Sequence, residues 1–184
     1  EVTLTVTDNN GNVSTATANV TVEDNIAPEI TCIADGTVDT DPGVCSYTVQ
    51  GTAFDATFTD NCTSSTLTND LTGTNTIAGE VLPLGDTVVT WTVDDGNGQT
   101  DTCTTTITVE DNEDPTAIAQ DVTVQLDANG VGSITAEQVD NGSSDNCGIA
   151  SLSVSPDTFD CSNLGGTSVP ITPTFIGNES QVTH

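Results

Sequence analysis

The sequence predicts an all-β protein built as a linear array of β-sandwich modules, and three observations support this prediction. Threonine and valine dominate the 184 residues, with 36 and 20 copies, and these β-branched residues favour strands. Short alternating segments recur between Gly, Pro, Asp and Asn, and none has a helical period. The sequence also repeats itself, because residues 3–28 align without a gap with residues 90–115.

The repeated segment has the pattern of a β-hairpin followed by a linker. Residues 2–6 and 17–22 alternate apolar and polar side chains on either side of an Asp/Asn/Gly turn, which is typical of a hairpin. The motif Glu-Asp-Asn-x-x-Pro then ends the strand, at residues 23–28 in the first copy and 110–115 in the second. Tandem modules joined by short linkers therefore account for the repeat.

Division of the chain at these linkers gives three parts. Residues 1–25 would be the C-terminal hairpin of a preceding module, residues 26–112 a complete module, and residues 113–184 an incomplete module that lacks its last strand. We expect the complete module to be an immunoglobulin-like β-sandwich, because its length suits seven short strands. Trp91 lies in the strand Val-Val-Thr-Trp-Thr-Val and is expected in the core. The expected strands are residues 29–33, 36–40, 44–50, 53–59, 65–70, 86–94 and 102–109.

The third part differs in type from the second. We expect strands at residues 121–126 and 133–136 around a turn at 127–130. Residues 169–183 look like a diverged copy of the opening hairpin, and two prolines make this tail a poor central strand.

Composition excludes several classes of partner. The chain has 28 acidic residues, no Lys and no Arg, so its net charge is −28. A surface without cations cannot neutralise phosphates, which excludes nucleic acid and direct contact with anionic membranes. No apolar run approaches the roughly 18 residues that a membrane span requires. Because the chain lacks Met and begins within the strand pattern, we expect it to be a piece of a longer protein.

Catalysis is not expected. The single histidine is the last residue and there is no lysine, so general-base, Schiff-base and Ser-His-Asp schemes lack components. A carboxylate pair such as Asp94 with Glu110 could in principle cleave glycosides. Carboxylates on the turns of a small sandwich are more often simply solvated, so we expect no enzyme.

The cysteines indicate structural disulfides and an extracellular location, because their number is even and no Cys-x-x-Cys pair occurs. Cys32 opens the first strand of the complete module and Cys103 opens its last. If these strands run side by side, both cysteines lie at one pole and pair. Each bond would contribute roughly 3 kcal/mol, and the alternative is that some cysteines are free buried thiols. The other expected pairs are Cys45 with Cys62 and Cys147 with Cys161.

Acidic and amide side chains cluster on the predicted turns and linkers. Calcium takes roughly six to eight oxygens from such groups, and because a turn and the linker after it recur together, an ion could fix the angle between modules. The plainer explanation is that turns prefer Asp, Asn and Gly, and no EF-hand loop is present. The candidate calcium ligands are Asp8, Asn10, Asn12, Glu23, Asp24, Asn25, Asp94, Asp95, Asn97, Glu110, Asp111 and Asn112.

Several motifs resemble those of a known family. They are the Glu-Asp-Asn-x-x-Pro linkers, Ile30-Thr31-Cys32, Thr59-Asp60-Asn61-Cys62, the segment from Trp91 to Gly98 and the segment from Asp121 to Gly130. Over nearly the whole chain they resemble the hyalin-repeat (HYR-like) immunoglobulin-type modules of giant cell-surface adhesins of gliding Bacteroidota. The resemblance implies a long surface filament that is exported by type IX secretion, moved by a membrane motor, and attached to the substratum.

The sequence therefore predicts a structural and adhesive repeat segment of a cell-surface filament involved in gliding motility. Its expected partners are neighbouring modules and a surface polysaccharide or the substratum, and Ca²⁺ is its candidate cofactor. Two alternatives stay open. A spacer or carbohydrate-binding module of a secreted enzyme would need an exposed aromatic platform, and the chain has few aromatics. A self-assembling fibre subunit would use residues 1–25 of one chain to complete residues 113–184 of the next by donor-strand pairing.

Overall fold

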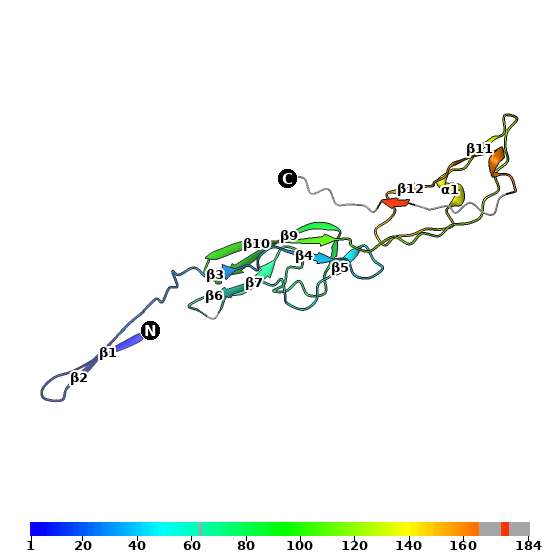
Figure 1. Ribbon diagram of the computed structural model, residues 1–184. Coiled ribbons are helices and arrows are strands. Elements are labelled where there is room, and N and C mark those ends of the chain that lie inside the picture. The colour runs from blue at the N-terminus through cyan, green and yellow to red at the C-terminus, as the bar shows by residue number, and fades with distance from the viewer. Residues whose placement is uncertain (63, 166–173, 177–184) are drawn as a thin grey trace.

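The computed structural model describes residues 1–62, 64–165 and 174–176. These residues form mostly β-strands in an elongated arrangement (Figure 1). A hairpin lies at one end, a β-sandwich in the middle and a smaller segment with short strands at the other end. The predicted all-β class is confirmed.

The secondary structure elements are short except in one hairpin of the sandwich, and no described helix is long and apolar enough to cross a membrane. In chain order they are β1 (Val2–Thr7), β2 (Val13–Ala18), β3 (Glu29–Thr31), β4 (Gly36–Asp39), β5 (Ser46–Thr48), β6 (Thr57–Thr59), β7 (Thr66–Asn69), β8 (Val81–Pro83), β9 (Gly85–Asp94), β10 (Thr100–Glu110), β11 (Val131–Ser133), α1 (Ala136–Val139), β12 (Ser151–Ser153), β13 (Thr158–Asp160), the 3-10 turn η1 (Cys161–Asn163) and β14 (Thr174–Ile176).

The sandwich consists of two layers. One layer is a four-stranded sheet in the order β4-β10-β9-β7, in which β4 runs parallel to β10 and the other pairs are antiparallel. The opposite layer holds two antiparallel pairs, β3 with β6 and β5 with β8. The strand that pairs with the end of β10 is β4, the second strand of the module, whereas the first strand, β3, pairs with β6. The expected side-by-side pairing of the first and last strands was therefore wrong, although a disulfide joins Cys32 to Cys103.

The core lies between these layers. Residues of β9 alternate between the core and solvent, so that Val89, Trp91 and Val93 all point inward with an exposed fraction of 0%. On β10, Ile107 and Val109 meet them from the neighbouring strand, and residues of the opposite layer complete the cluster. The predicted core position of Trp91 is confirmed. Burial of these apolar side chains is the main favourable contribution to the stability of the module.

Each strand expected within residues 26–112 matches an observed strand. Two other details of the strand prediction were wrong, one in this module and one in the first hairpin. The sequence analysis missed β8, because its three residues lie between turn signals that look like a continuous loop. In the first hairpin, the second strand was expected at residues 17–22 and is found at Val13–Ala18. The equivalent strand β10 is longer because β4 pairs along its second half, and residues 19–23 have no such strand beside them in the described chain.

The third part differs more from its prediction. Residues 121–126 are not a strand. The strand expected at 133–136 is found at Val131–Ser133 (β11) instead, and the helix α1 begins at Ala136. Thr135 and Gln138 cap this helix reciprocally, in a local pattern that overrides the β-branched residues before it. The predicted turn at 127–130 is confirmed by the hydrogen bond from Gly130 N to Asp127 O. The tail expected at 169–183 lies outside the described residues except for the backbone of β14.

The buried side chain of Asn69 organises the loop that follows β7. Its Nδ2 donates to Thr72 Oγ1 at 2.9 Å and Thr74 O at 2.8 Å, while its Oδ1 accepts from the backbone N–H groups of Leu71 and Thr72. This residue is 4% exposed, so water cannot replace these partners.

We expect Asn69→Ala to lower the free energy of unfolding by about 2–3 kcal/mol, because it removes the hydrogen bonds that a buried side chain makes to part-buried backbone groups of the loop. Urea denaturation of the full chain measures this change. The exposed neighbour Asn75 provides the control, and Asn75→Ala should change stability by less than about 0.5 kcal/mol. Equal effects of the two substitutions would contradict the assigned role of Asn69.

Candidate functional site

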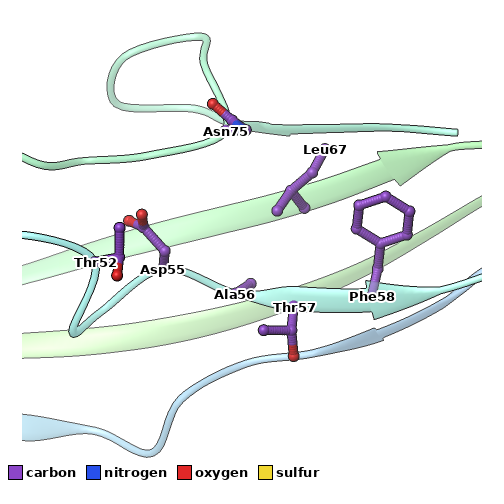
Figure 2. A pocket seen from close by; sticks show the side chains of 7 residues that line it. All are labelled: Thr52, Asp55, Ala56, Thr57, Phe58, Leu67 and Asn75. Atoms are coloured by element: carbon purple, nitrogen blue, oxygen red, sulfur yellow. The ribbon is translucent and has the colours of Figure 1, made fainter.

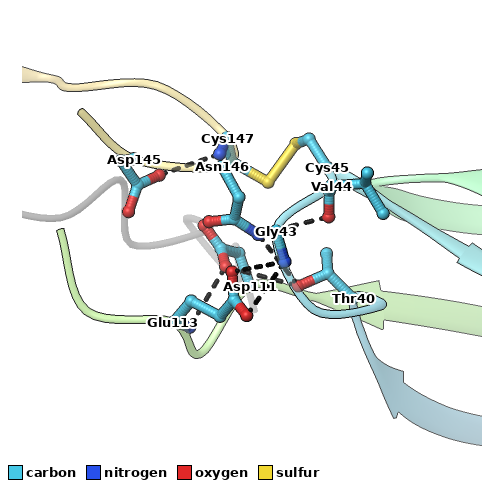
Figure 3. Close-up of a disulfide and its surroundings, with 9 residues drawn as sticks. All are labelled: Thr40, Gly43, Val44, Cys45, Asp111, Glu113, Asp145, Asn146 and Cys147. Atoms are coloured by element: carbon cyan, nitrogen blue, oxygen red, sulfur yellow. Dashed lines mark hydrogen bonds between the residues drawn. A yellow bond between two sulfur atoms is a disulfide. The ribbon is translucent and has the colours of Figure 1, made fainter. Parts of the chain in front are cut away.

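The sandwich and the third part meet at a junction that a disulfide and several hydrogen bonds hold together (Figure 3). Three segments meet there: the loop 40–45 after β4, the linker 110–114 after β10, and the loop 144–147. The first two belong to the sandwich, and the parallel pairing of β4 with β10 brings them to the same pole. The third part contributes the loop with the sequence Asp145-Asn146-Cys147.

A disulfide between Cys45 and Cys147 joins the two parts covalently at this junction, across a sequence separation of 102 residues. The predicted pairs Cys45 with Cys62 and Cys147 with Cys161 were therefore wrong. Cys62 lies between β6 and β7 at the opposite pole of the sandwich, and Cys161 begins η1 beyond β13. Both are exposed and free of disulfides in the structure.

Side-chain hydrogen bonds surround this disulfide. The amide Nδ2 of Asn146 donates to Thr40 Oγ1 and to Val44 O, both at 3.2 Å. From the linker, the carboxylate of Glu113 accepts from the backbone N–H of Gly43 at 3.0 and 3.1 Å. Figure 3 shows these contacts converging on the loop 40–45 from two sides. The loop is therefore held both by its own linker and by the following part of the chain.

The second disulfide lies within the sandwich. Cys32 follows β3 and Cys103 lies on β10, directly opposite Trp91 of β9 in the sheet register. The bond joins the two layers beside the core, and both cysteines pack against the buried apolar cluster. The predicted pairing of Cys32 with Cys103 is confirmed.

Comparison with known proteins identifies this architecture. Residues 23–109 match the family model of the HYR domain. Residues 23–109 are therefore similar to an HYR domain, and they are called the HYR domain below. The match covers the sandwich with its first linker and ends near the last residue of β10, and an HYR domain is a non-catalytic immunoglobulin-like β module. No curated protein and no solved structure matches the chain.

The two disulfides and the HYR domain indicate an extracellular protein. Disulfides persist in oxidising compartments and are rare in the cytosol. The predicted boundaries of the three parts, 1–25, 26–112 and 113–184, stay a prediction.

Three turns of the chain share one geometry, and only one of them lies in the HYR domain. Each has the sequence Asp-x-Asn-Gly, beginning at Asp8, Asp95 and Asp127. In each turn the aspartate Oδ1 accepts from the backbone N–H groups two and four residues later, at 2.7 to 2.9 Å. The fourth residue is a glycine with φ of 86°, 105° and 78° respectively, a conformation that other residues rarely adopt. The aspartates are therefore structural parts of the turns.

The candidate calcium ligands are distributed over distant poles. The turn at 94–98 lies beside the linker 23–28 that precedes the sandwich, since Gln99 Nε2 donates to Asp24 O at 3.3 Å. The linker 110–112 lies at the opposite pole, where Asn112 Nδ2 donates to Asp39 Oδ1 at 2.7 Å. Within the described residues, no group of three His, Cys, Asp or Glu side chains is placed to hold a metal ion. Calcium binding stays a prediction, and at these loops it would compete with the hydrogen bonds above.

The distance between the two poles also shows whether the carboxylates of Asp94 and Glu110 are close enough to act together. Asp94 ends β9 and pairs with Thr100 at the start of β10, while Glu110 is the last residue of β10. Ten residues of extended strand span about 33 Å, far more than the roughly 5–10 Å between the carboxylates of a glycosidase. The pair cannot cooperate in cleaving a glycosidic bond.

One open hollow of about 420 Å³ lies on the surface of the HYR domain (Figure 2). Phe58 stands at its edge with an exposed fraction of 36%, while the single tryptophan is buried in the core. Asp55 at the other side accepts a hydrogen bond from the backbone N–H of Ile77 at 3.0 Å. The lining residues are Thr52, Asp55, Ala56, Thr57, Phe58, Leu67 and Asn75.

The aspartate turns should lose stability in acid. Hydrogen bonds lower the pKa of Asp8, mainly the side-chain bond from Asn12, and that of Asp127, mainly the bond from the N–H of Val131. A carboxylate whose pKa is lower in the folded than in the unfolded state stabilises the fold above its unfolded pKa, and this stabilisation is lost as the pH falls through the folded pKa.

We therefore expect the turns at 8–12 and 127–131 to open as the pH falls from about 4 toward 2. Amide chemical shifts of Asn10, Asn129 and Val131, followed by NMR, measure this opening. Asp127→Asn keeps an oxygen acceptor but no longer titrates, so it should remove the pH dependence at its own turn only. Shifts that stay constant over this range in the unsubstituted chain would contradict the assignment.

Proposed function

We infer that the chain is a structural and adhesive segment of a long extracellular filament, in which successive modules are fixed end to end. The observation that carries this proposal is the junction between the HYR domain and the third part. A disulfide, the Asn146 amide and the Glu113 carboxylate all hold one loop there. Such a junction transmits force and orientation between neighbours and needs no active site.

The opening hairpin supports the array. Strands β1 and β2 correspond to β9 and β10 in the sequence repeat, and the positions of Val2, Leu4 and Val6 match those of Val89, Trp91 and Val93. The latter three are buried in the HYR domain, whereas Val2, Leu4 and Val6 are 49%, 64% and 56% exposed. A hairpin with an uncovered core face fits a further module on the N-terminal side, whose remaining strands would cover it.

The charge of the chain also favours an extended filament. With 28 acidic residues and no Lys or Arg, neighbouring modules repel one another and cannot fold back through ion pairs. The junctions therefore need bonds that do not depend on opposite charges, which disulfides and amide hydrogen bonds provide.

At a finer level, we propose that this filament is a cell-surface adhesin similar to the gliding-motility adhesin SprB of Bacteroidota, which the sequence motifs most resemble. Its partners would be neighbouring modules and a surface polysaccharide or the substratum. In-frame removal of residues 1–184 from the protein in its own cell should lower attachment to glass and slow gliding. Normal attachment and gliding of these cells would contradict the adhesive role.

Small-angle scattering and electron microscopy of the full chain test the filament proposal directly. We expect a rigid rod whose length equals the sum of its parts, without interconversion to a compact form. Mass measurement of the denatured protein from its source then separates two forms of assembly. Hundreds of kilodaltons indicate a continuous filament, whereas a mass near the 18.8 kDa of this chain indicates a subunit that assembles by strand exchange.

Calcium stiffening of the junctions is a separate proposal, supported by the acidic turns and linkers. If calcium binds there, the Tm of the oxidised full chain rises by several degrees when EDTA is replaced by calcium. An unchanged Tm would mean that disulfides and direct contacts alone set the stiffness.

Carbohydrate binding is a second candidate function, and the hollow beside Phe58 favours it. Sugars stack on exposed aromatic rings and bond to carboxylates and amides, which Asp55 and Asn75 would supply at this hollow. Titration calorimetry with surface polysaccharide fragments tests this function, with Phe58→Ala as the variant and Phe159→Ala of the third part as the control. Binding that survives Phe58→Ala would exclude this hollow as the site.

A further inference from the structure

Two loops of the chain share the sequence Asp-Asn-Cys. One is the loop 145–147, whose Cys147 is bonded to Cys45 in the loop of the preceding module. The other is the loop 60–62 at the N-terminal pole of the HYR domain, where Cys62 is exposed and free. The second loop therefore has the same three residues as the first, but its cysteine is not bonded.

The surroundings of the two loops match in detail. At the occupied junction, Asn146 donates to Thr40 Oγ1, and the Thr40 hydroxyl lies 3.4 Å from Asp111 Oδ1 of the linker. At the N-terminal pole, Asn61 Nδ2 donates to Oδ1 of Asp24 at 3.1 Å. Asp24 stands 87 residues before Asp111, in the equivalent linker. At the occupied junction, Thr40 of the loop 40–45 lies between the asparagine amide and the linker carboxylate. At the N-terminal pole, the Asn61 amide binds the Asp24 carboxylate directly.

The opposite end of the described structure presents a thiol near the matching loop. Gly130-Val131 repeats Gly43-Val44 at the same spacing of 87, and Gly132 stands where Cys45 would be. Cys161 supplies a sulfur there instead, because its Sγ lies 3.9 Å from Gly130 O. Cys161 is exposed and free of disulfides. Free cysteines therefore lie at the N-terminal pole of the HYR domain and at the far end of the third part, on either side of the Cys45–Cys147 junction.

We propose that Cys62 forms a disulfide with a cysteine on the distal loop of a preceding HYR-like module, so that the modules are cross-linked in series. This inference rests on the proposed filament. It assigns to the junction before the HYR domain the kind of bond that Cys45 and Cys147 form at the junction after it. The partner is a cysteine presented as Cys45 is, on a Gly-containing loop beside a Glu-Asp-Asn linker. Cys161 is the equivalent distal thiol for the module that follows.

The chemistry is a two-electron oxidation. Each thiol loses one proton and one electron, the S–S bond forms, and the disulfide of an extracytoplasmic thiol oxidoreductase accepts the electrons and protons to become two thiols.

Disulfide mapping of the protein isolated from its own cells tests this inference. Free thiols are alkylated first, and the unreduced protein is cleaved after Asp and Glu, because the described sequence has no Lys or Arg for trypsin. We expect the Cys62 peptide to be bonded to a cysteine peptide other than those of positions 32, 45, 103 and 147. An alkylated Cys62, a mixed disulfide with a small thiol, or a bond to Cys161 of the same chain would overturn the proposal.

The source of the partner follows from the mass of the denatured protein before and after reduction. An unchanged mass shows that the partner lies in the same polypeptide, and a lower mass after reduction shows a second chain; both support the bond. Cys62→Ser is the matched control, since it should leave the partner cysteine alkylated and keep the Cys45–Cys147 bond. A rod-shaped protein with a free Cys62 would overturn only this cross-link and leave the filament proposal intact.

Discussion

Loss of the Cys32–Cys103 bond is expected to lower the free energy of unfolding of the HYR domain by about 4 kcal/mol. The bond closes a loop across a sequence separation of 71 residues, so its removal returns considerable entropy to the unfolded chain. It also joins the two layers of a sandwich whose described core contains one tryptophan and few other aromatic residues. A domain of this size is commonly stable by only about 5–15 kcal/mol, so this loss is a large fraction of the total.

The double variant Cys32→Ala, Cys103→Ala measures this effect without leaving a free thiol. Urea denaturation of the full chain, followed by the fluorescence of buried Trp91, reports on the HYR domain alone. Cys62→Ala is the matched control, because this cysteine is exposed and free of disulfides, and it should change stability by less than about 0.5 kcal/mol. A loss below about 1 kcal/mol in the double variant would contradict the assigned contribution.

Removal of the Cys45–Cys147 bond is expected to act on the third part and leave the HYR domain stable. The described third part buries only two apolar side chains, Ile134 and Val139, so it has little core of its own. The bond spans a sequence separation of 102 residues, for which the entropic contribution is about 4–5 kcal/mol. We expect residues 113–165 to lose most of their protection against hydrogen exchange in the variant Cys45→Ser, Cys147→Ser.

Hydrogen exchange with mass spectrometry resolves the two parts, and scattering records the loss of a fixed angle between them. The control is Cys161→Ser, which removes a thiol from the same part without breaking a disulfide of the structure. Full protection of residues 113–165 in the double variant would show that hydrogen bonds from Asn146 and Glu113 suffice to hold the junction.

Part of the candidate site could be predicted from the sequence because it depends on local patterns. The Asp-x-Asn-Gly turns are set by residues at most four apart, and the alternation of Val89, Trp91 and Val93 predicts which face of β9 is buried. The Cys32–Cys103 pair was predicted correctly although the strands beside these cysteines are not neighbours in one sheet, because the bond instead joins the two layers of the sandwich. The helix α1 and strand β8 were missed because segments of three or four residues carry too weak a periodicity.

The sequence by itself determined the all-β class, the repeat, the core position of Trp91 and the presence of structural disulfides typical of extracellular proteins. Only the tertiary structure decided that Cys45 pairs with Cys147, and that Cys62 lies at the N-terminal pole of the sandwich while Cys161 lies in the third part. The physical reason is that disulfide formation requires Cα atoms within about 7 Å. Which cysteines approach so closely depends on the parallel pairing of β4 with β10, which brings the loop 40–45 to the exit of the HYR domain.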